Sequence, residues 1–454
     1  MNNKFFWGNS TSSMQTEGAQ ESYGKGKSVY STYKATENTS DWMVAIDEYH
    51  RYEEDFDLMK EMGVNCYRFQ ISWSRIFPKG YGEINEEGIE FYKNLIKALK
   101  IRNIEPMICL YHFDMPLYLA EKYDGFSSKF VKDKFVEFGR FLVDEFNEDV
   151  KYWMTFNEHN LYATDLAFKI SGSSKENNLK NLYQIMHNTL VAHGEIAKYI
   201  HRNYEDLKIG GMLAYSSVYA NSSNPKDILM AEKYDDFTNK LFLDVFNMKG
   251  YPRFFNQYLR NNGIDLEIDE DELDIINSIE SDFLSFSYYQ STTIKNNGNI
   301  DNFNIFNSEM IVDNKYLNRS SWNWEIDPIG LRIAMNRIYN YTKIPLFITE
   351  NGIGLKEKLP ENEFIEDDER IDYHREHIKN MIKAMEIDGV ENIGYLAWGL
   401  IDILSSSGNM EKRYGAVYVN RGNHDLKDLR RIPKKSFKFF KKVFESNAKD
   451  GLDD

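Results

Sequence analysis

The chain has 454 residues, of which 42% are hydrophobic and 28% charged, and its formal net charge at pH 7 is −16. This apolar content suffices for a large core, whereas the acidic balance disfavours nucleic acids and anionic membranes as partners. No apolar run approaches the roughly 20 residues that cross a bilayer, and the N-terminus lacks a signal-peptide pattern. We therefore expect a soluble, cytoplasmic protein with no membrane partner, whose only cysteines, Cys66 and Cys109, are buried free thiols.

Eight short apolar segments with strand character recur along the chain and alternate with stretches whose apolar residues have helical spacing. Several are almost continuously apolar, as is typical of parallel strands covered on both faces. In chain order, the expected strands are 4–10, 65–73, 105–113, 150–158, 208–215, 281–289, 344–352 and 392–400. The clearest expected helices are 91–103 and 129–146.

Strands that alternate with helices indicate a parallel α/β sheet, and eight such units fit a (β/α)₈ TIM barrel with extended βα loops. An open doubly wound sheet is the alternative. It usually carries a glycine-rich turn after its first strand, whereas "FFWGNSTSS" contains a single glycine. The sequence contains no linker or internal repeat, so we expect residues 1–454 to form a single domain; the oligomeric state stays open.

The sequence lacks motifs for a cofactor, a metal or a nucleophilic serine. The run "GKGKS" (24–28) resembles the end of a P-loop, but Glu21 occupies the position of the required first glycine, and GxGxxG, HExxH and GxSxG are absent. His374 and His377 have no evident partner ligand, so we expect a solvated helix face rather than a metal site. The basic run 429–444 has Phe and Val at helical spacing, which predicts a final helix packed on the barrel rather than a nucleic-acid site.

Two acidic residues stand out because each ends an apolar strand: Glu158 follows "YWMTFN" and Glu350 follows "PLFIT". The C-terminal ends of barrel strands form the face on which TIM barrels carry their chemistry. One such residue alone would indicate a loop or helix cap, but two suit glycoside hydrolysis, in which one carboxyl donates a proton and the other attacks or activates water. Burial would raise one pKa and a cation would lower the other; Arg68 is the candidate cation, or else a structural ion pair of the barrel.

These segments, taken in chain order, resemble the family-one glycoside hydrolases, the β-glucosidase clan of TIM barrels. The resemblance extends from "FFWGNSTSSMQTEGA" to "KKSFKFFKKV", nearly the whole chain. The stretches that carry it are "HRYEEDFDLMKEMGVNCYRFQISWSRIFPKG", "LYHFDMP", "TFNE", "DFLSFSYY", "WEIDPIGLR", "FITENG" and "GYLAWGLID".

The resemblance implies a role for each matching residue. Glu158 matches the general acid/base and Glu350 the nucleophile of enzymes that retain anomeric configuration, which places their carboxyl groups ~5 Å apart. The positions that match substrate-binding residues are Gln15, His112 and Asn157 for the sugar hydroxyls, Tyr289 for orienting the nucleophile, Trp398 beneath the sugar, and Trp324 on the aglycone path or in the core.

The stretch "ILSSSGNMEKRYG" departs from the ordinary β-glucosidases of this family, whose loop after the last strand carries Glu-Trp. In the branch that acts on 6-phosphorylated sugars, a Ser, a Lys seven residues on and a Tyr nine residues on bind the phosphate. Ser405, Lys412 and Tyr414 have that spacing. Replacing a carboxylate with a hydroxyl removes repulsion of a phosphate dianion, and Lys412, with Arg413 beside it, is expected to supply positive charge.

Three further positions bear on substrate choice and pH behaviour. Ser287 stands where hydroxyl-specific relatives carry Asn, and the small Ser406 stands where the phospho-galactosidase branch tends to carry Trp. His159 replaces the Pro or apolar residue that usually follows the acid/base. It either points into the pocket, where its protonation would lower the pKa of Glu158, or faces the barrel wall.

We therefore predict a glycoside hydrolase that cleaves a small-molecule substrate, a 6-phospho-β-D-glucoside, to glucose 6-phosphate and an aglycone, without metal or cofactor. A β-glucosidase and a 6-phospho-β-galactosidase are the nearer alternatives. A non-catalytic sugar-phosphate binding protein on the same fold is a third, which the presence of both Glu158 and Glu350 disfavours.

Overall fold

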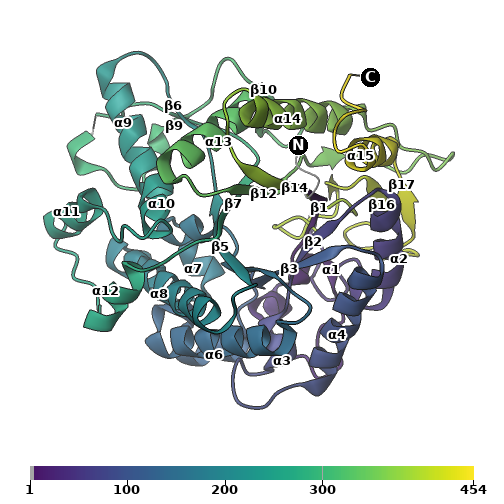
Figure 1. Ribbon diagram of the computed structural model, residues 1–454, viewed down its shortest axis with the longest axis horizontal. Helices are drawn as coiled ribbons and strands as arrows, with labels where there is room; N and C mark the ends of the chain where they lie inside the picture. The colour runs from purple at the N-terminus through teal and green to yellow at the C-terminus, as the bar shows by residue number, and fades with distance from the viewer. Residues whose placement is uncertain (1–4, 299, 454) are drawn as a thin grey trace.

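The computed structural model describes residues 5–298 and 300–453. Eight parallel strands close into a barrel in the order β1-β14-β12-β7-β5-β4-β3-β2, and helices surround it (Figure 1). The barrel strands are β1 Phe6–Ser10, β2 Cys66–Gln70, β3 Glu105–Tyr111, β4 Tyr152–Phe156, β5 Lys208–Ala214, β7 Phe283–Tyr288, β12 Leu346–Asn351 and β14 Asn392–Trp398. Each lies within one of the eight predicted segments, so the TIM barrel is confirmed and the open sheet is wrong.

Helices connect consecutive barrel strands and cover the outside of the sheet (Figure 1). Their bounds are α1 Ser13–Thr16, α2 Glu48–Glu61, α3 Trp73–Ile76, α4 Glu86–Ile101, α5 Leu117–Tyr123, α6 Lys129–Phe146, α7 Ala167–Ile170, α8 Leu179–Asn203, α9 Pro225–Asp235, α10 Leu241–Val245, α11 Arg253–Asn261, α12 Glu270–Ile276, α13 Pro328–Thr342, α14 Asp368–Glu386 and α15 Lys435–Glu445. Helix α6 has the predicted bounds, because Val131, Phe135, Phe138 and Leu142 recur at helical spacing and are all buried.

The loops after the barrel strands are long and carry small sheets of their own. These strands are β6 Val218–Ala220, β8 Thr292–Ile294, β9 Ile311–Val312, β10 Asn318–Arg319, β11 Glu325–Ile326, β13 Leu355–Lys356, β15 Lys412–Arg413, β16 Val417–Val419 and β17 Arg431–Pro433. The antiparallel pair β13–β15 joins the loop after β12 to the loop after β14. The predicted extension of the βα loops is thus confirmed.

The interior of the barrel is filled with apolar side chains toward the N-terminal ends of its strands and is polar toward their C-terminal ends. A cluster of Cys, Met, Phe and Leu side chains, which includes both cysteines as buried free thiols, fills the N-terminal part. Along β7, alternate residues face the interior, so Phe283 belongs to this cluster while Ser285 and Ser287 follow it toward the C-terminal end. The packed floor thus supports the polar groups above it.

The prediction for the final basic segment is confirmed, whereas that for His374 and His377 is wrong. Helix α15 buries Phe437, Phe440 and Val443 against the barrel, as predicted. The expectation of a solvated face at His374 and His377 is wrong: both are at most 1% exposed, because α14 packs between α13 and α15. His374 Nδ1 lies 2.7 Å from the Tyr395 hydroxyl, within hydrogen-bond distance. Among residues 5–298 and 300–453, no helix is both long and apolar enough to cross a bilayer.

Candidate active site

The residues singled out in the sequence gather at the C-terminal ends of the barrel strands. Glu350 lies in β12, Arg68 in β2 and Trp398 at the last position of β14. His112 follows β3 directly, Tyr289 follows β7 directly, and Glu158 lies two residues beyond β4. This is the face on which TIM barrels carry their chemistry.

A β-bulge turns Glu350 into the barrel. Phe347 belongs to the interior cluster, so strict alternation would direct residue 349, not Glu350, inward. The register with β7 shifts between Ile348 and Glu350, which re-aims the carboxylate. Arg68 Nη1 then donates to Glu350 Oε1 at 2.6 Å, and the Tyr289 hydroxyl donates to Oε2 at 2.8 Å.

Opposing influences act on the ionisation of Glu350. Its side chain is only 3% exposed, and this burial raises its pKa. The charge of Arg68 and the hydrogen bonds from Tyr289 and Arg68 counteract that rise by stabilising the carboxylate. Both oxygens of Glu350 are therefore held by donors that favour the ionised form.

Glu158 lies in different surroundings. Its backbone has φ +44° and ψ +58°, a left-handed conformation that is uncommon for a residue with a side chain and that ends the strand abruptly. Within the described part of the chain, the one side chain that donates a hydrogen bond to Glu158 is Ser287, at 2.5 Å. Burial, followed by the negative charge of Glu350, raises the pKa of Glu158 to about 8. A carboxyl with that pKa is mostly protonated at neutral pH.

Arg68 connects the two halves of the site. It is fully buried, and its Nη2 donates to Asn157 Oδ1 at 2.6 Å while its Nη1 also reaches Ser10 Oγ at 3.1 Å. The guanidinium thus fixes Glu350 on β12 and Asn157, the residue before Glu158, relative to each other. The fork geometry of arginine suits such a two-sided contact.

Gln15, His112 and Trp398 line another side of the site. The rings of His112 and Trp398 lie 5.6 Å apart. Burial, followed by the charge of Arg68, keeps the pKa of His112 well below its usual range, so the ring is neutral and can both donate and accept hydrogen bonds. Gln15 Nε2 donates to Leu404 O at 2.6 Å, which fixes the loop after β14 beside it.

Lys412, Trp324 and Tyr414 form a second group near the nucleophile. The Lys412 ammonium lies 3.6 Å from the centroid of the Trp324 ring and 5.5 Å from that of Tyr414. Trp324 in turn contacts Tyr289, with ring centroids 5.5 Å apart. Burial lowers the pKa of Lys412 to about 8. Trp324 therefore lies between the nucleophile's partner and the lysine instead of in the core.

Ser405 and Arg413, in the loop after β14, both have partners within the protein. Ser405 Oγ accepts from Asn409 N at 3.0 Å and lies 2.9 Å from Ser407 Oγ, and among the described residues it has no hydrogen bond to Lys412 or Tyr414. The expectation that Arg413 adds charge to this site is wrong. Successive residues of a strand face opposite ways, and its guanidinium is buried beside Asp402, at 3.2 Å.

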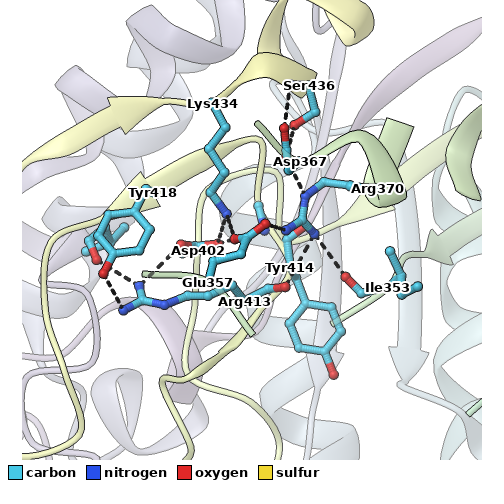
Figure 2. A network of polar contacts seen from close by, with 12 residues as sticks. Ile353, Glu357, Asp367, Arg370, Asp402, Arg413, Tyr414, Tyr418, Lys434 and Ser436 are labelled. Carbon is cyan, nitrogen blue, oxygen red and sulfur yellow. Dashed lines mark hydrogen bonds and ion pairs between the residues drawn. The ribbon is translucent and has the colours of Figure 1, made fainter. Parts of the chain in front are cut away.

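A buried ionic network fixes the backbone at Tyr414 (Figure 2). Arg370, on α14, donates through Nη1 to Tyr414 O at 2.7 Å and to Ile353 O at 3.0 Å. Its other nitrogens pair with Asp367 at 2.8 Å and Glu357 at 2.5 Å. Because Ile353 follows the nucleophile strand and Tyr414 belongs to the other loop, Arg370 joins the two.

His159 faces away from the two carboxylates. Its ring is 1% exposed and lies 4.6 Å from Phe156, 5.7 Å from Tyr162 and 5.7 Å from Phe246, measured between ring centroids. Burial, followed by the charge of His193, keeps its pKa well below the usual range, so the ring is neutral. Of the two alternatives, the structure therefore places His159 at the barrel wall.

Sequence reasoning missed three residues: Ser10, Arg370 and Trp322, whose ring centroid lies 5.7 Å from the Lys412 ammonium. Ser10 ends β1 and could have been found by the same strand-end rule that found Glu158 and Glu350. The contacts of Arg370 and Trp322 join segments distant in sequence, and no local pattern indicates them. Within residues 5–298 and 300–453, no group of three or more His, Cys, Asp or Glu side chains has a metal-binding arrangement.

Comparison with known proteins identifies the family. The chain matches the family description "Glycosyl hydrolase family 1" over residues 1–449. The chain belongs to glycosyl hydrolase family 1. It is 38% identical to aryl-phospho-beta-D-glucosidase BglA of Bacillus subtilis (98% of each chain) and 37% identical to a 6-phospho-beta-glucosidase of Clostridium longisporum (98% of this chain, 97% of that one). A solved family 1 β-glucosidase of Thermotoga maritima superposes with TM-score 0.88 at 29% identity, over 99% of each chain.

Proposed function

We propose that this family 1 glycoside hydrolase cleaves 6-phospho-β-D-glucosides with retention, using Glu158 as general acid/base and Glu350 as nucleophile. The observation that carries this assignment is the contrast between the two carboxyl groups. Glu350 has both oxygens held by Arg68 and Tyr289, whereas Glu158 has one hydroxyl donor and a pKa of about 8. Carboxyl groups whose environments separate their pKa values are the usual acid and base of such sites.

In the first step, Glu350 attacks the anomeric carbon while the proton of Glu158 passes to the glycosidic oxygen, so the aglycone leaves as an alcohol. The negative charge on Glu350 is consumed as the glycosyl ester forms. Burial of Glu158 is unchanged, but the repulsion by Glu350 that adds to the rise of its pKa is removed. Glu158, now ionised, can accept a proton. Water then attacks the anomeric carbon, Glu158 takes its proton, and glucose 6-phosphate leaves while Glu350 regains its charge.

Four side chains would hold the sugar in this proposal. Gln15, His112 and Asn157 offer amide and imidazole groups that can donate to and accept from hydroxyls. Trp398 offers a flat apolar face, packed against His112, for the apolar side of the pyranose ring. Such positioning is worth a large share of the rate enhancement in a displacement of this kind.

Lys412 and Tyr414 support a phosphorylated sugar. The ammonium of Lys412 has no carboxylate within ion-pair distance among the described residues, and it lies beside the ring of Tyr414. A phosphate dianion would raise the pKa of Lys412 again and would accept charge-assisted hydrogen bonds from its ammonium group. Ser405 would join this site only after its hydroxyl leaves Ser407. Relatives named for phospho-β-glucosides, at 37–38% identity over nearly the whole chain, agree with this substrate class.

The setting of the reaction is part of the proposal. We place the reaction in the cytoplasm, because transport systems that phosphorylate sugars during import deliver the phosphorylated sugars there. We also propose that residues 1–454 act as one catalytic domain. If the chain instead contained two domains that unfold independently, thermal unfolding would show two transitions.

The substrate test compares p-nitrophenyl 6-phospho-β-glucoside with p-nitrophenyl β-glucoside. We expect kcat/KM to be at least about 100-fold higher for the phosphorylated compound, since several charge-assisted hydrogen bonds are at stake. Preference for the plain glucoside would refute the phosphate assignment. Glu350→Gln should abolish turnover, and unchanged turnover in that variant would refute the mechanism. Binding of glucose 6-phosphate by a wild-type protein without turnover would identify a sugar-phosphate binding protein instead.

A further inference from the structure

Two lysines face each other across the small sheet beside the proposed phosphate site. In the antiparallel pair β13–β15, Lys356 is the direct cross-strand partner of Lys412. Directly opposed residues have their side chains on the same face, with Cβ atoms about 5 Å apart, and like charges in such a pair are destabilising. The free protein therefore carries an unfavourable pair next to the site.

The two ammonium groups share an aromatic ring. Lys356 Nζ lies 5.1 Å and Lys412 Nζ lies 5.7 Å from the centroid of Trp322. A ring attracts a cation through its quadrupole but carries no net charge. Trp322 therefore gathers the two lysines without neutralising either.

No carboxylate compensates for this pair. Among the described residues, no Asp or Glu oxygen lies within ion-pair distance of Lys356 or Lys412. Glu357, the acidic neighbour of Lys356, faces inward and pairs with Arg370 and Lys434, at 2.5 Å each. An acidic protein, with a net charge of −16, thus leaves two adjacent cations unpaired at this place.

The loop that follows the nucleophile strand guides Lys412 into position. Its side chain lies across Gly354, where a Cβ atom would come within 2.6 Å of Lys412 Cγ and 2.7 Å of Cε. Only a glycine lets the lysine stem pass so close to this backbone. The lysine stem thus stays beside the loop that follows β12, four residues after Glu350, while Lys356 is exposed.

We infer that Lys356 is a second cation of the anion site and that it contacts the phosphate group of the substrate together with Lys412. This inference rests on the proposed function, because it takes the phosphate of a 6-phospho-β-glucoside as the anion. A dianion with three terminal oxygens can accept hydrogen bonds from both ammonium groups, and it turns the repulsion between them into attraction to a shared partner. Trp322 holds the pair ready at one edge of the site.

The first experiment measures KM for p-nitrophenyl 6-phospho-β-glucoside in Lys356→Gln, with Lys358→Gln as the matched control. Lys358 is an exposed lysine of the same loop that forms no ion pair or ring contact within the described part of the chain. We expect Lys356→Gln to raise KM roughly threefold to fivefold, which is the upper part of the range for one exposed charge–charge contact. Lys358→Gln should stay within a factor of two of wild type, and Lys356→Arg should restore most of the loss.

The second experiment measures melting temperature with and without glucose 6-phosphate. Lys356→Gln relieves the repulsion in the free protein, so its melting temperature without ligand should equal or exceed that of wild type. The increase caused by glucose 6-phosphate should be smaller than in wild type. A lysine that only supports the loop would give the opposite result, a lower melting temperature without ligand and an unchanged increase.

The outcomes separate this inference from the proposed function. If Lys412→Gln raises KM while Lys356→Gln behaves like Lys358→Gln, the second cation is refuted and the phosphate assignment stands. If wild type prefers the plain glucoside and glucose 6-phosphate does not stabilise it, the proposed function fails. Stabilisation by inorganic phosphate equal to that by glucose 6-phosphate would also overturn the inference, because it would indicate a free-anion site rather than a substrate contact.

Discussion

Replacing Ser287 with alanine tests the proposed acid role of Glu158 without touching either carboxylate. The Ser287 hydroxyl donates to Glu158 Oε1 at 2.5 Å, and this hydrogen bond favours the ionised carboxylate. Without it, the pKa of Glu158 rises from about 8. A hydrogen bond to a charged group contributes about 1.5–3 kcal/mol, and one pKa unit corresponds to 1.36 kcal/mol. We therefore expect the pKa of Glu158 to rise by about one unit, the lower part of that range, because its side chain is partly exposed to solvent.

The assay is the pH dependence of kcat at saturating p-nitrophenyl 6-phospho-β-glucoside, measured from about pH 5 to pH 10. Saturating substrate is needed because the pKa of Lys412 in the free protein is also about 8, and a bound phosphate raises it out of this range. Glu158 must be protonated to donate, so activity falls as pH rises through its pKa. A raised pKa therefore moves the alkaline limb to higher pH. The second ionisation of a phosphate monoester, near pH 6, affects only the acid limb and does not obscure the result.

Ser285→Ala provides the matched control, since Ser285 lies two residues earlier on the same inner face. Its hydroxyl donates to Gly211 O at 2.8 Å, and it has no hydrogen bond to either carboxylate. We expect its alkaline limb to coincide with that of wild type. An unmoved or lowered limb in Ser287→Ala, or an equal shift in both variants, would refute the reasoning.

Three further predictions concern buried charges. Glu158→Gln should be more stable than wild type by about 4 kcal/mol at pH 8 but equally stable near pH 4. The reason is that a carboxyl whose pKa rises from 4.5 to about 8 on folding destabilises the folded protein progressively as pH rises between those values; urea unfolding at both pH values measures this. Arg68→Lys should lower kcat/KM about 100-fold or more, since one ammonium cannot reach both Glu350 and Asn157; an equal kcat/KM would contradict the bridging role. Arg370→Met should cost about 3–5 kcal/mol of stability and raise KM for the phosphorylated substrate more than for the plain one, and equal changes in both KM values would show that Arg370 does not position the phosphate site.

The barrel and the location of its site could be read from the sequence because both follow from local patterns. Near-continuous apolar runs mark strands buried on both faces, and chain order then fixes a parallel barrel. Once the strands are known, Glu158 and Glu350 lie at one face by the strand-end rule alone. The finer geometry could not be read, since the left-handed backbone at Glu158 and the bulge before Glu350 depend on neighbouring strands.

The side-chain arrangement of the loops could not be predicted from the sequence for a related reason. Lys412 and Arg413 look alike as a basic dipeptide, but strand alternation sends one toward Trp324 and the other into the barrel flank beside Asp402. That division could have been foreseen had the dipeptide been recognised as a strand. The pairing of Lys356 with Lys412 could not, because it joins two loops that only the closed barrel brings together.

Local charge, and not net charge, decides how this acidic protein can hold a dianion. At physiological ionic strength the Debye length is about 8 Å, so most of the surface carboxylates that produce the net charge of −16 are screened from the site. Glu357, the residue that follows Lys356 in the chain, is already paired with Arg370 and Lys434. Lys412, half desolvated against Trp324, is screened much less. Binding of the phosphorylated substrate should consequently weaken only modestly as salt rises, and a steep salt dependence of KM would show that the anion site is open to solvent instead.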